Sequence, residues 1–323
     1  MTRHTRQFGP LLLILVVVAL VPVLFGVGGI TNLLEQVFAF ALFAMSYDLL
    51  IGYTGVVSFG HAVFFGTGAY VVGIFLAHSG GSSGGLLVGT CVALGMSILL
   101  SLLIASISLR IRTVYFAMIT LAVGQTFYVL SGSQMLQPLT NADDGMTVPL
   151  PVWLTHDRPV YYFSLAVLVL CLVLLRLFVR SPVGLVLQGI RENEGRVLTL
   201  GHSVYRFKSI AFVISGLMAT VAGILYVIAQ TFVSTGVYDV SISLDVLLMT
   251  IIGGIGTLYG GLLGALIIIV AQTEFTNLAG TYPIFGRYTI LFGVLYIVIV
   301  RFMPRGIVGT ILESIKRRSG QEG

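Results

Sequence analysis

The sequence has few charged residues for its length. Of 323 residues only 9% are charged, whereas a soluble domain carries about 25%, because water has to solvate most of its surface. This shortage excludes a soluble enzyme, a disordered chain and, despite a net charge of +5, a nucleic-acid-binding protein. Hydrophobic residues make up 57% of the chain, so we predict a polytopic membrane protein.

Lysine and cysteine are scarcer still. Neither of the two lysines, Lys208 and Lys316, follows a glycine, so neither fits the G-x-x-x-x-G-K-[ST] loop that cradles nucleotide phosphates. The two cysteines, Cys91 and Cys171, lie in apolar runs, and we interpret them as core residues rather than as disulfide or metal ligands. The sequence therefore predicts no ATPase, catalytic, cofactor or metal site in this chain.

The apolar residues form long continuous runs, unlike the alternating segments of about ten residues that are typical of a membrane β-barrel. Because lipid offers no hydrogen bonds to the backbone, a spanning helix needs about 20 mainly apolar residues. We therefore predict an all-α polytopic membrane protein of about ten transmembrane helices, with residues 1–323 as one transmembrane domain. The predicted spans are 11–28, 31–51, 57–78, 86–109, 114–134, 160–179, 209–230, 244–258, 261–279 and 286–302.

Basic residues indicate the orientation of these spans, because lysine and arginine near span ends stay on the cytoplasmic side. With the N-terminus in the cytoplasm, ten alternating spans place 15 of the 17 basic residues on that side, leaving Arg158 and Arg287 outside. We expect both termini in the cytoplasm, a periplasmic loop over residues 135–159 and a basic cytoplasmic loop over residues 180–208. Each long loop is a candidate docking surface; the alternative is that it is only solvated.

Glycines are concentrated in two segments, GYTGVVSFGHAVFFGTGAYVVG at residues 52–73 and GGIGTLYGGLLG at residues 253–264. Each leads from a predicted inward-going span into an outward-going one, which suggests two related halves with glycine-broken helices. Interrupted hydrophobic segments at corresponding positions of two halves indicate a translocation site. The alternative is that the glycines only allow close helix packing, and that the histidine only packs or caps. The candidate pathway residues are Ser58, Gly60, His61, Gly66 and Gly254.

Acidic residues within predicted spans are functional candidates, because burying one in lipid costs at least about 2.5 kcal/mol. Asp48, Asp245 and Glu274 each lie within about two turns of an interface, where this cost falls. Nothing in the pattern resembles a relay of carboxylates across the middle of the membrane. The sequence therefore argues against a proton-driven secondary transporter.

Six segments, in order along the chain, carry a family resemblance. They are DLLIGYTGVVSFGHAVFFGTGAY (48–70), LRIRTVYFAMITLAVGQ (109–125), LTNADDGM (139–146), SPVGLVLQGIRENEGRVLTLGHSVYRFK (181–208), SLDVLLMTIIGGIGTLYGGLLGA (243–265) and RFMPRGI (301–307). Together they cover nearly the whole chain. The sequence resembles the branched-chain amino acid permease family of ABC importers, and within it the M-type membrane subunit.

This resemblance implies a multi-pass permease in the bacterial inner membrane that is not itself an enzyme. The implied partners are a second permease subunit in a heterodimer, two cytoplasmic ATP-binding subunits that hydrolyse ATP, a periplasmic substrate-binding protein and membrane lipid, without nucleic acid. ABC permeases insert a cytoplasmic coupling helix into a cleft on the ATPase, and the matching stretch here is residues 190–201. We hypothesise that Glu192, Glu194 and Arg196 contact the ATPase. The coupling-loop candidates are Ile190, Glu192, Glu194, Arg196 and Gly201.

Other functions stay open at this point. A urea or short-chain amide ABC permease shares most of these motifs, although the DDG of residues 143–145 favours amino acids. An ion-coupled secondary transporter would take up solute in vesicles without ATP or partner subunits. A membrane enzyme would convert the solute chemically, but the sequence shows no clustered catalytic groups.

Overall fold

The described part of the chain folds into a helical bundle. In this computed structural model we describe residues 18–23, 28–109, 113–141 and 144–279, and the single residues 293, 306, 307 and 310. The elements are α2 (Gly29–Ile51), α3 (Ala62–His78), α4 (Ser83–Ser108), α5 (Thr113–Ser131), α6 (Gln137–Thr140), β1 (Met146–Thr147), η3 (Val152–Leu154), α7 (Asp157–Arg180), α8 (Pro182–Glu192), α9 (Glu194–Thr199), α10 (Val204–Gln230), β2 (Phe232–Val233), η4 (Thr235–Tyr238), α11 (Val240–Gly253) and α12 (Tyr259–Ala279).

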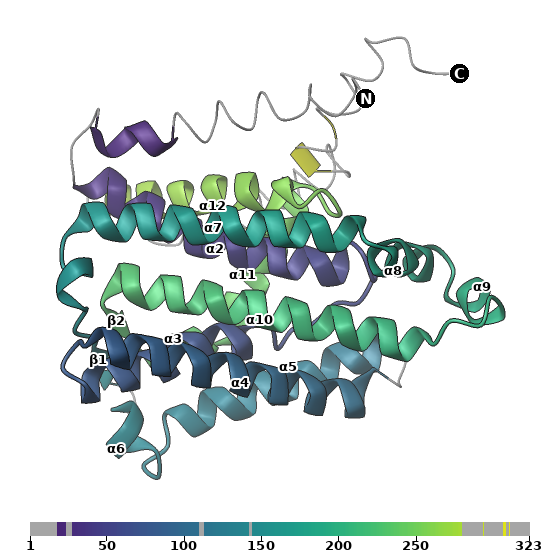
Figure 1. Ribbon diagram of the computed structural model, residues 1–323, viewed down its shortest axis with the longest axis horizontal. Coiled ribbons are helices and arrows are strands. Elements are labelled where there is room, and N and C mark those ends of the chain that lie inside the picture. Colours follow the sequence, from purple (N-terminus) through teal and green to yellow (C-terminus); the bar gives the residue numbers. More distant parts are fainter. Residues whose placement is uncertain are drawn as a thin grey trace.

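The bundle has two distinct ends (Figure 1). At the β end, β1 and β2 pair antiparallel, with Met146 opposite Val233, and so tie the loop of residues 135–159 to the end of α10. At the α8–α9 end, the two short helices α8 and α9 project beyond the long ones. Both lie in the loop of residues 180–208.

Helix α2 forms the centre of the bundle. It packs against α10, α12, α7 and α11, and 83% of its most apolar stretch is buried. A helix that is apolar on all sides belongs inside a protein or a membrane. Its aromatic residues Phe38, Phe40 and Phe43 are buried in the main core. Helices α7, α10, α11 and α12 therefore share α2 as a packing surface.

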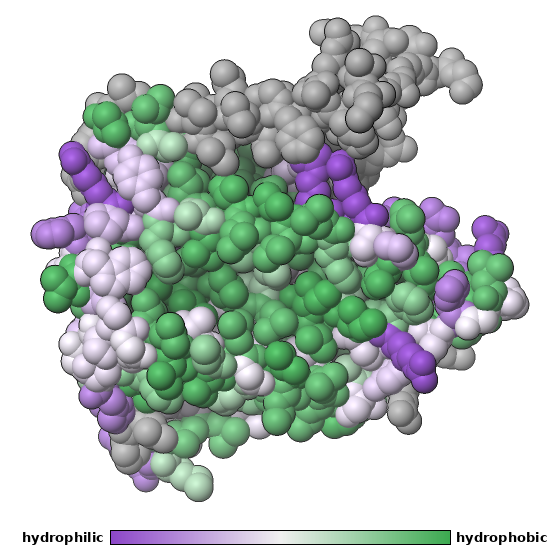
Figure 2. Space-filling model, in the orientation of Figure 1, coloured by the Kyte–Doolittle hydropathy of each residue, from purple (hydrophilic) through white to green (hydrophobic). Residues whose placement is uncertain are grey.

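Lipid-facing surface is supplied by outer helices. Figure 2 shows a broad apolar surface between two ends at which hydrophilic residues gather. Large apolar side chains on α4, α5 and α7 are exposed, as expected where lipid tails replace water. Examples are Leu87, Leu99, Leu102, Val114, Met118, Leu170 and Leu177.

Six of the described helices are long and apolar enough to cross a membrane, namely α2, α4, α5, α7, α10 and α12, while α3 and α11 are shorter. This confirms an all-α polytopic membrane protein. Only residues 18–23 and 28 of the predicted span 11–28, and only residue 293 of the predicted span 286–302, are among the described residues. The total of ten spans and the side on which the termini lie therefore remain predictions.

Two predicted spans were wrong at one end. The span predicted over residues 57–78 begins as a helix only at Ala62, and the one predicted over residues 244–258 ends at Gly253. In both places the sequence stays apolar while the backbone leaves the helix. Both non-helical stretches form hydrogen bonds with other elements of the bundle.

Candidate functional site

The two glycine-rich segments each contain a non-helical stretch, and these stretches touch. We call residues 52–61, between α2 and α3, the first break, and residues 254–258, between α11 and α12, the second break. The Tyr53 hydroxyl donates to the Gly256 carbonyl at 3.0 Å, across more than 200 residues of sequence. The breaks therefore form one structural unit.

A buried carboxylate from α2 holds the second break. Asp48 is fully buried, and its two oxygens accept hydrogen bonds from the backbone N–H groups of Gly256, at 2.6 Å, and Leu258, at 2.9 Å. These N–H groups precede α12 and have no helical partners. Asp48 therefore acts as a cap supplied by another helix.

The backbone of the second break needs glycine. Gly254 and Gly256 have φ values of 122° and 81°, in a region that side chains with a Cβ rarely adopt. The Thr257 hydroxyl donates to the Gly254 carbonyl at 2.7 Å and accepts from the Gly260 N–H at 3.0 Å, which caps the first turn of α12. The predicted pathway residue Gly254 therefore lies at the point where α11 ends.

Helix α8 reaches this unit through Arg191. The guanidinium group donates to the carbonyl of Gly52, which follows the last residue of α2, and it interacts electrostatically with Asp48. It also lies against Gly256, since a Cβ added there would be 3.1 Å from the Arg191 Nη1 atom. One side chain of the cytoplasmic loop predicted from the sequence thus contacts both breaks.

The prediction of coupling residues from the sequence missed Arg191, although it immediately precedes Glu192. Tyr53, also missed, lies beyond the end of α2. Burial, reinforced by Asp48, raises the pKa of its hydroxyl above the ordinary value of 10, so the hydroxyl remains a hydrogen-bond donor at neutral pH. A signal for both was available in the sequence. Arg191 lies within the predicted coupling stretch of residues 190–201, and Tyr53 lies within the glycine-rich segment of residues 52–73.

The first break ends at His61, whose ring is buried. Its Nε2 atom is 3.0 Å from the Ser46 hydroxyl and 3.4 Å from that of Ser215, and its ring stacks on Phe43 with 5.4 Å between centroids. These partners come from α2 and α10. Among the described residues, the His61 Nδ1 atom and the neighbouring Ser58 hydroxyl have no hydrogen-bond partner.

Two further helices fix the backbone of the first break. The Phe59 N–H donates to the Thr120 hydroxyl on α5 at 3.2 Å, and the Ala62 N–H donates to the Ser243 hydroxyl on α11 at 2.9 Å. Hydrogen bonds from neighbouring helices satisfy backbone groups that the missing helical turns leave free. This is how a non-helical stretch is tolerated inside the bundle.

The glycines predicted to line a pathway are packed against other helices. A Cβ on Gly60 would be 2.0 Å from the Thr120 carbonyl oxygen, and one on Gly66 would be 2.4 Å from the Tyr238 ring. Gly60, Gly66 and Gly254 are all buried. Close packing, the alternative left open above, therefore accounts for Gly60 and Gly66 in this conformation, and their place along a pathway stays a prediction.

The predicted coupling residues divide into an anchored and an exposed group. Ile190 is buried in a small core with Leu187, Val197 and Val204, which fixes α8 and α9 to the start of α10. Gly201 ends the unit with a φ of 85°. The loop is therefore a folded element with its own core, not a solvated linker.

The remaining predicted coupling residues, Glu192, Glu194 and Arg196, are exposed. Glu194 forms an ion pair with Lys208 of α10 at 2.8 Å. Leu198 and Leu200, at the end of α9, are 55% and 70% exposed. These two leucines were missed in the prediction, which named only charged residues as contacts with the ATPase.

Comparison with known proteins gives consistent results. The family model described as "Branched-chain amino acid transport system / permease component" matches residues 29–300. The high-affinity branched-chain amino acid transport system permease protein LivM of Salmonella typhimurium is 25% identical, over 91% of this chain and 73% of its own length. The Escherichia coli protein of the same name is 24% identical, over 90% and 73%.

An archaeal protein is also similar. The probable branched-chain amino acid transport permease protein LivM of Methanocaldococcus jannaschii is 23% identical, over 82% of this chain and 89% of its own length. No solved structure matches the chain.

Proposed function

The chain belongs to the branched-chain amino acid permease family, and from this premise we propose that it forms a translocation pathway together with a second permease subunit. It is a multi-pass inner-membrane protein and a permease subunit of a branched-chain amino acid ABC importer. The observation that carries this function is the match of the family model to residues 29–300, which include all the described helices from α2 to α12.

The proposed complex contains two permeases in a heterodimer, two cytoplasmic ATP-binding subunits and a periplasmic substrate-binding protein. The need for separate ATPases follows from the sequence, in which neither lysine fits a phosphate-binding loop. The proposed orientation places the α8–α9 end in the cytoplasm. It is supported by Arg180, Arg191, Arg196 and Arg206 at that end.

Helix α9 is the proposed contact with the ATPase. Exposed apolar side chains at the end of a short helix suit a hydrophobic groove on a partner protein, because binding there removes them from water. Leu198 and Leu200 are such side chains. Glu192, Glu194 and Arg196, which are also exposed, are the proposed polar contacts. The buried Ile190 holds α9 at a fixed position relative to α10.

Arg191 is the proposed mechanical link from the ATPase to the pathway. When ATP binding closes the ATPases, α9 and α8 move together because they share one core. Arg191 then shifts the carbonyl of Gly52 and, through Asp48 and Tyr53, the second break. The helices that follow the breaks, α3 and α12, are thereby reoriented, which opens the pathway to alternate sides.

Reconstitution tests the proposed function. The complete complex in proteoliposomes should take up leucine only with internal ATP and external substrate-binding protein. Uptake driven by an ion gradient alone would overturn the importer mechanism. Competition with urea and short-chain amides separates the remaining substrate classes. A complex that transports urea but neither leucine, isoleucine nor valine would overturn the assignment to branched-chain amino acids.

A further inference from the structure

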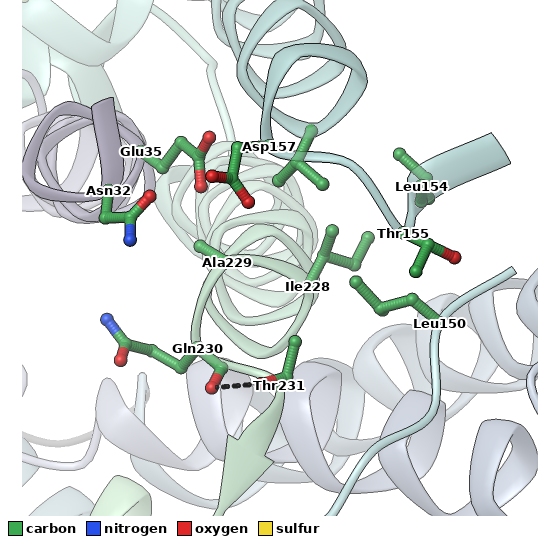
Figure 3. Close-up of a pocket in the computed structure, with 11 residues that line it drawn as sticks. Asn32, Glu35, Leu150, Leu154, Thr155, Asp157, Ile228, Ala229, Gln230 and Thr231 are labelled. Carbon is green, nitrogen blue, oxygen red and sulfur yellow. Dashed lines mark hydrogen bonds between the residues drawn. The ribbon is translucent and has the colours of Figure 1, made fainter. Parts of the chain in front are cut away.

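A pocket of about 320 Å³ lies at the β end of the bundle (Figure 3). It is enclosed by the first turns of α2, the start of α7 and the last turn of α10. Four of its lining residues, Leu150, Leu154, Thr155 and Asp157, belong to the loop of residues 135–159. That loop is the one predicted to face the periplasm.

Two carboxylates point into this pocket from different helices. Glu35 of α2 is only 3% exposed, and its Oε1 atom has no hydrogen-bond partner among the described residues. Asp157, the first residue of α7, is close enough to Glu35 for the two groups to interact electrostatically. A buried carboxylate is costly unless it is paired with a cation or hydrogen-bond donors.

Among the described residues, no cationic side chain lines this pocket. The eleven residues that line the pocket include no lysine, arginine or histidine. Arg158 and His156 line a neighbouring, more open hollow over residues 155–159, which shares Thr155 and Asp157 with the pocket. The pocket therefore presents two acidic groups to whatever enters it from the β end.

The other walls of the pocket match the rest of an aliphatic amino acid. Leu150, Leu154 and Ile228 form an aliphatic surface, while the side-chain amides of Asn32 and Gln230 offer donors for a carboxylate. Ligand pockets usually measure about 300–1,000 Å³, so this one suits a small solute. Charge, amide donors and apolar walls occur together in one cavity.

We propose that this pocket binds the ammonium group of an aliphatic amino acid through Glu35 and Asp157 as the amino acid enters the permease. The proposal rests on the proposed function, which sets the substrate class and the side from which it comes. The buried Glu35 gives the stronger contact, because its charge is shielded least by water. Asp157, which is exposed, assists at the rim.

The test uses the complete complex with Glu35→Gln, which keeps the side-chain shape, and Asp157→Asn, at an exposed position where folding is not at risk. Glu274→Gln on α12 is the matched control, because Glu274 is exposed and lies outside the pocket. Receptor-dependent leucine uptake is measured in proteoliposomes. We expect an initial rate at least tenfold lower for Glu35→Gln, a smaller loss for Asp157→Asn and no change for Glu274→Gln.

A second measurement reads binding directly. Equilibrium dialysis of radiolabelled leucine against the purified complex, without substrate-binding protein, should give binding at least tenfold weaker for Glu35→Gln than for wild type. The amine 3-methylbutylamine should compete with leucine, whereas 4-methylpentanoate, which lacks the ammonium group, should not. Equal competition by the amine and the acid would overturn the proposed ammonium site.

The two proposals fail in different ways. Wild-type leucine uptake together with unchanged uptake and binding in Glu35→Gln would overturn the pocket and leave the importer function intact. A wild-type complex that moves no branched-chain amino acid would overturn the proposed function. Dialysis of radiolabelled 3-methylbutylamine would then still decide the site, since loss of its binding in Glu35→Gln supports it and unchanged binding rejects it.

Discussion

Arg191 donates a hydrogen bond to the carbonyl of Gly52, so the second-last residue of α8 is joined to the residue that follows α2. The last carbonyls of a helix lack intrahelical donors, and a cation near them is favoured by the helix dipole. This contact connects the folded α8–α9 unit to the central helix of the bundle. Through Arg191, the proposed ATPase contact is connected to both breaks.

Substituting Arg191→Ala should uncouple ATP hydrolysis from transport. The complex should assemble and hydrolyse ATP, because much of Arg191 is exposed and its loss leaves the core of α8 and α9 intact. Leucine uptake should fall about tenfold, which corresponds to the loss of a charged hydrogen bond of about 1.5 kcal/mol. The measurement is the ratio of solute taken up to ATP hydrolysed in proteoliposomes.

Two variants control this experiment. Arg191→Lys should restore uptake only in part, because a lysine ammonium cannot reproduce the planar geometry of a guanidinium. Arg206→Ala, an exposed arginine near the start of α10, should leave the ratio unchanged. If Arg206→Ala lowers the ratio as much as Arg191→Ala, net charge at this end matters and the contact with Gly52 does not.

Asp48→Asn should destabilise the second break. The carboxylate accepts from two backbone N–H groups, whereas an amide has one oxygen and would turn its own N–H groups toward the second donor. The expected loss is about 1–3 kcal/mol, with a larger loss for Asp48→Ala. Thermal denaturation of the purified complex measures it.

Asp239→Asn is the matched control for this prediction. Asp239 caps α11 by accepting from the Ser241 N–H at 2.7 Å, and asparagine caps a helix about as well as aspartate. The melting temperature should therefore stay at the wild-type value. A melting temperature of Asp48→Asn equal to that of Asp239→Asn would contradict the role of the Asp48 carboxylate.

Gly60→Ala should separate the first break from α5. The added methyl group would lie 2.0 Å from the Thr120 carbonyl oxygen, a backbone atom that cannot rotate away. Overpacking of this kind typically costs about 1–3 kcal/mol. A lower melting temperature and reduced leucine uptake are expected together.

Gly95→Ala provides the comparison, since nothing lies within 4 Å of a Cβ at that position of α4. Alanine in a helix is favoured over glycine by about 0.5–1 kcal/mol, so this variant should be as stable as wild type or slightly more so. Wild-type stability and uptake in Gly60→Ala would show that the close approach to Thr120 is dispensable.

The sequence was sufficient to predict most of the helices. The predicted spans 31–51 and 261–279 correspond to α2 and α12 with differences of two residues or fewer, because their apolar runs end at glycines. It was not sufficient to predict where α3 begins and α11 ends. Those limits depend on hydrogen bonds between residues about 200 positions apart, as in the contacts of Asp48 with Gly256 and Leu258.

The site was predictable to a similar extent. Glycine content pointed to both breaks. The contact between the breaks and the hydrogen bond from Arg191 to Gly52 depend on the tertiary fold. Glu35 lies within the predicted span 31–51 and was missed, although an acidic residue in a span is itself a signal. Its significance comes from burial and from Asp157, which is more than 100 residues away.

The ion pair between Glu194 and Lys208 allows a test of what Glu194 contributes. If the pair only holds α9 against α10, exchanging the charges as Glu194→Lys with Lys208→Glu should restore any loss caused by Glu194→Lys alone. A partly exposed pair of this kind contributes about 0.2–1 kcal/mol, so stability should change little in the single and the double variants.

The proposed ATPase contact predicts a different pattern. Uptake and co-purification of the ATPase should stay low in the double exchange, because a positive charge then faces the ATPase at position 194. Full recovery of both in the double exchange would assign Glu194 to the ion pair and leave Leu198 and Leu200 as the contacts that hold the ATPase.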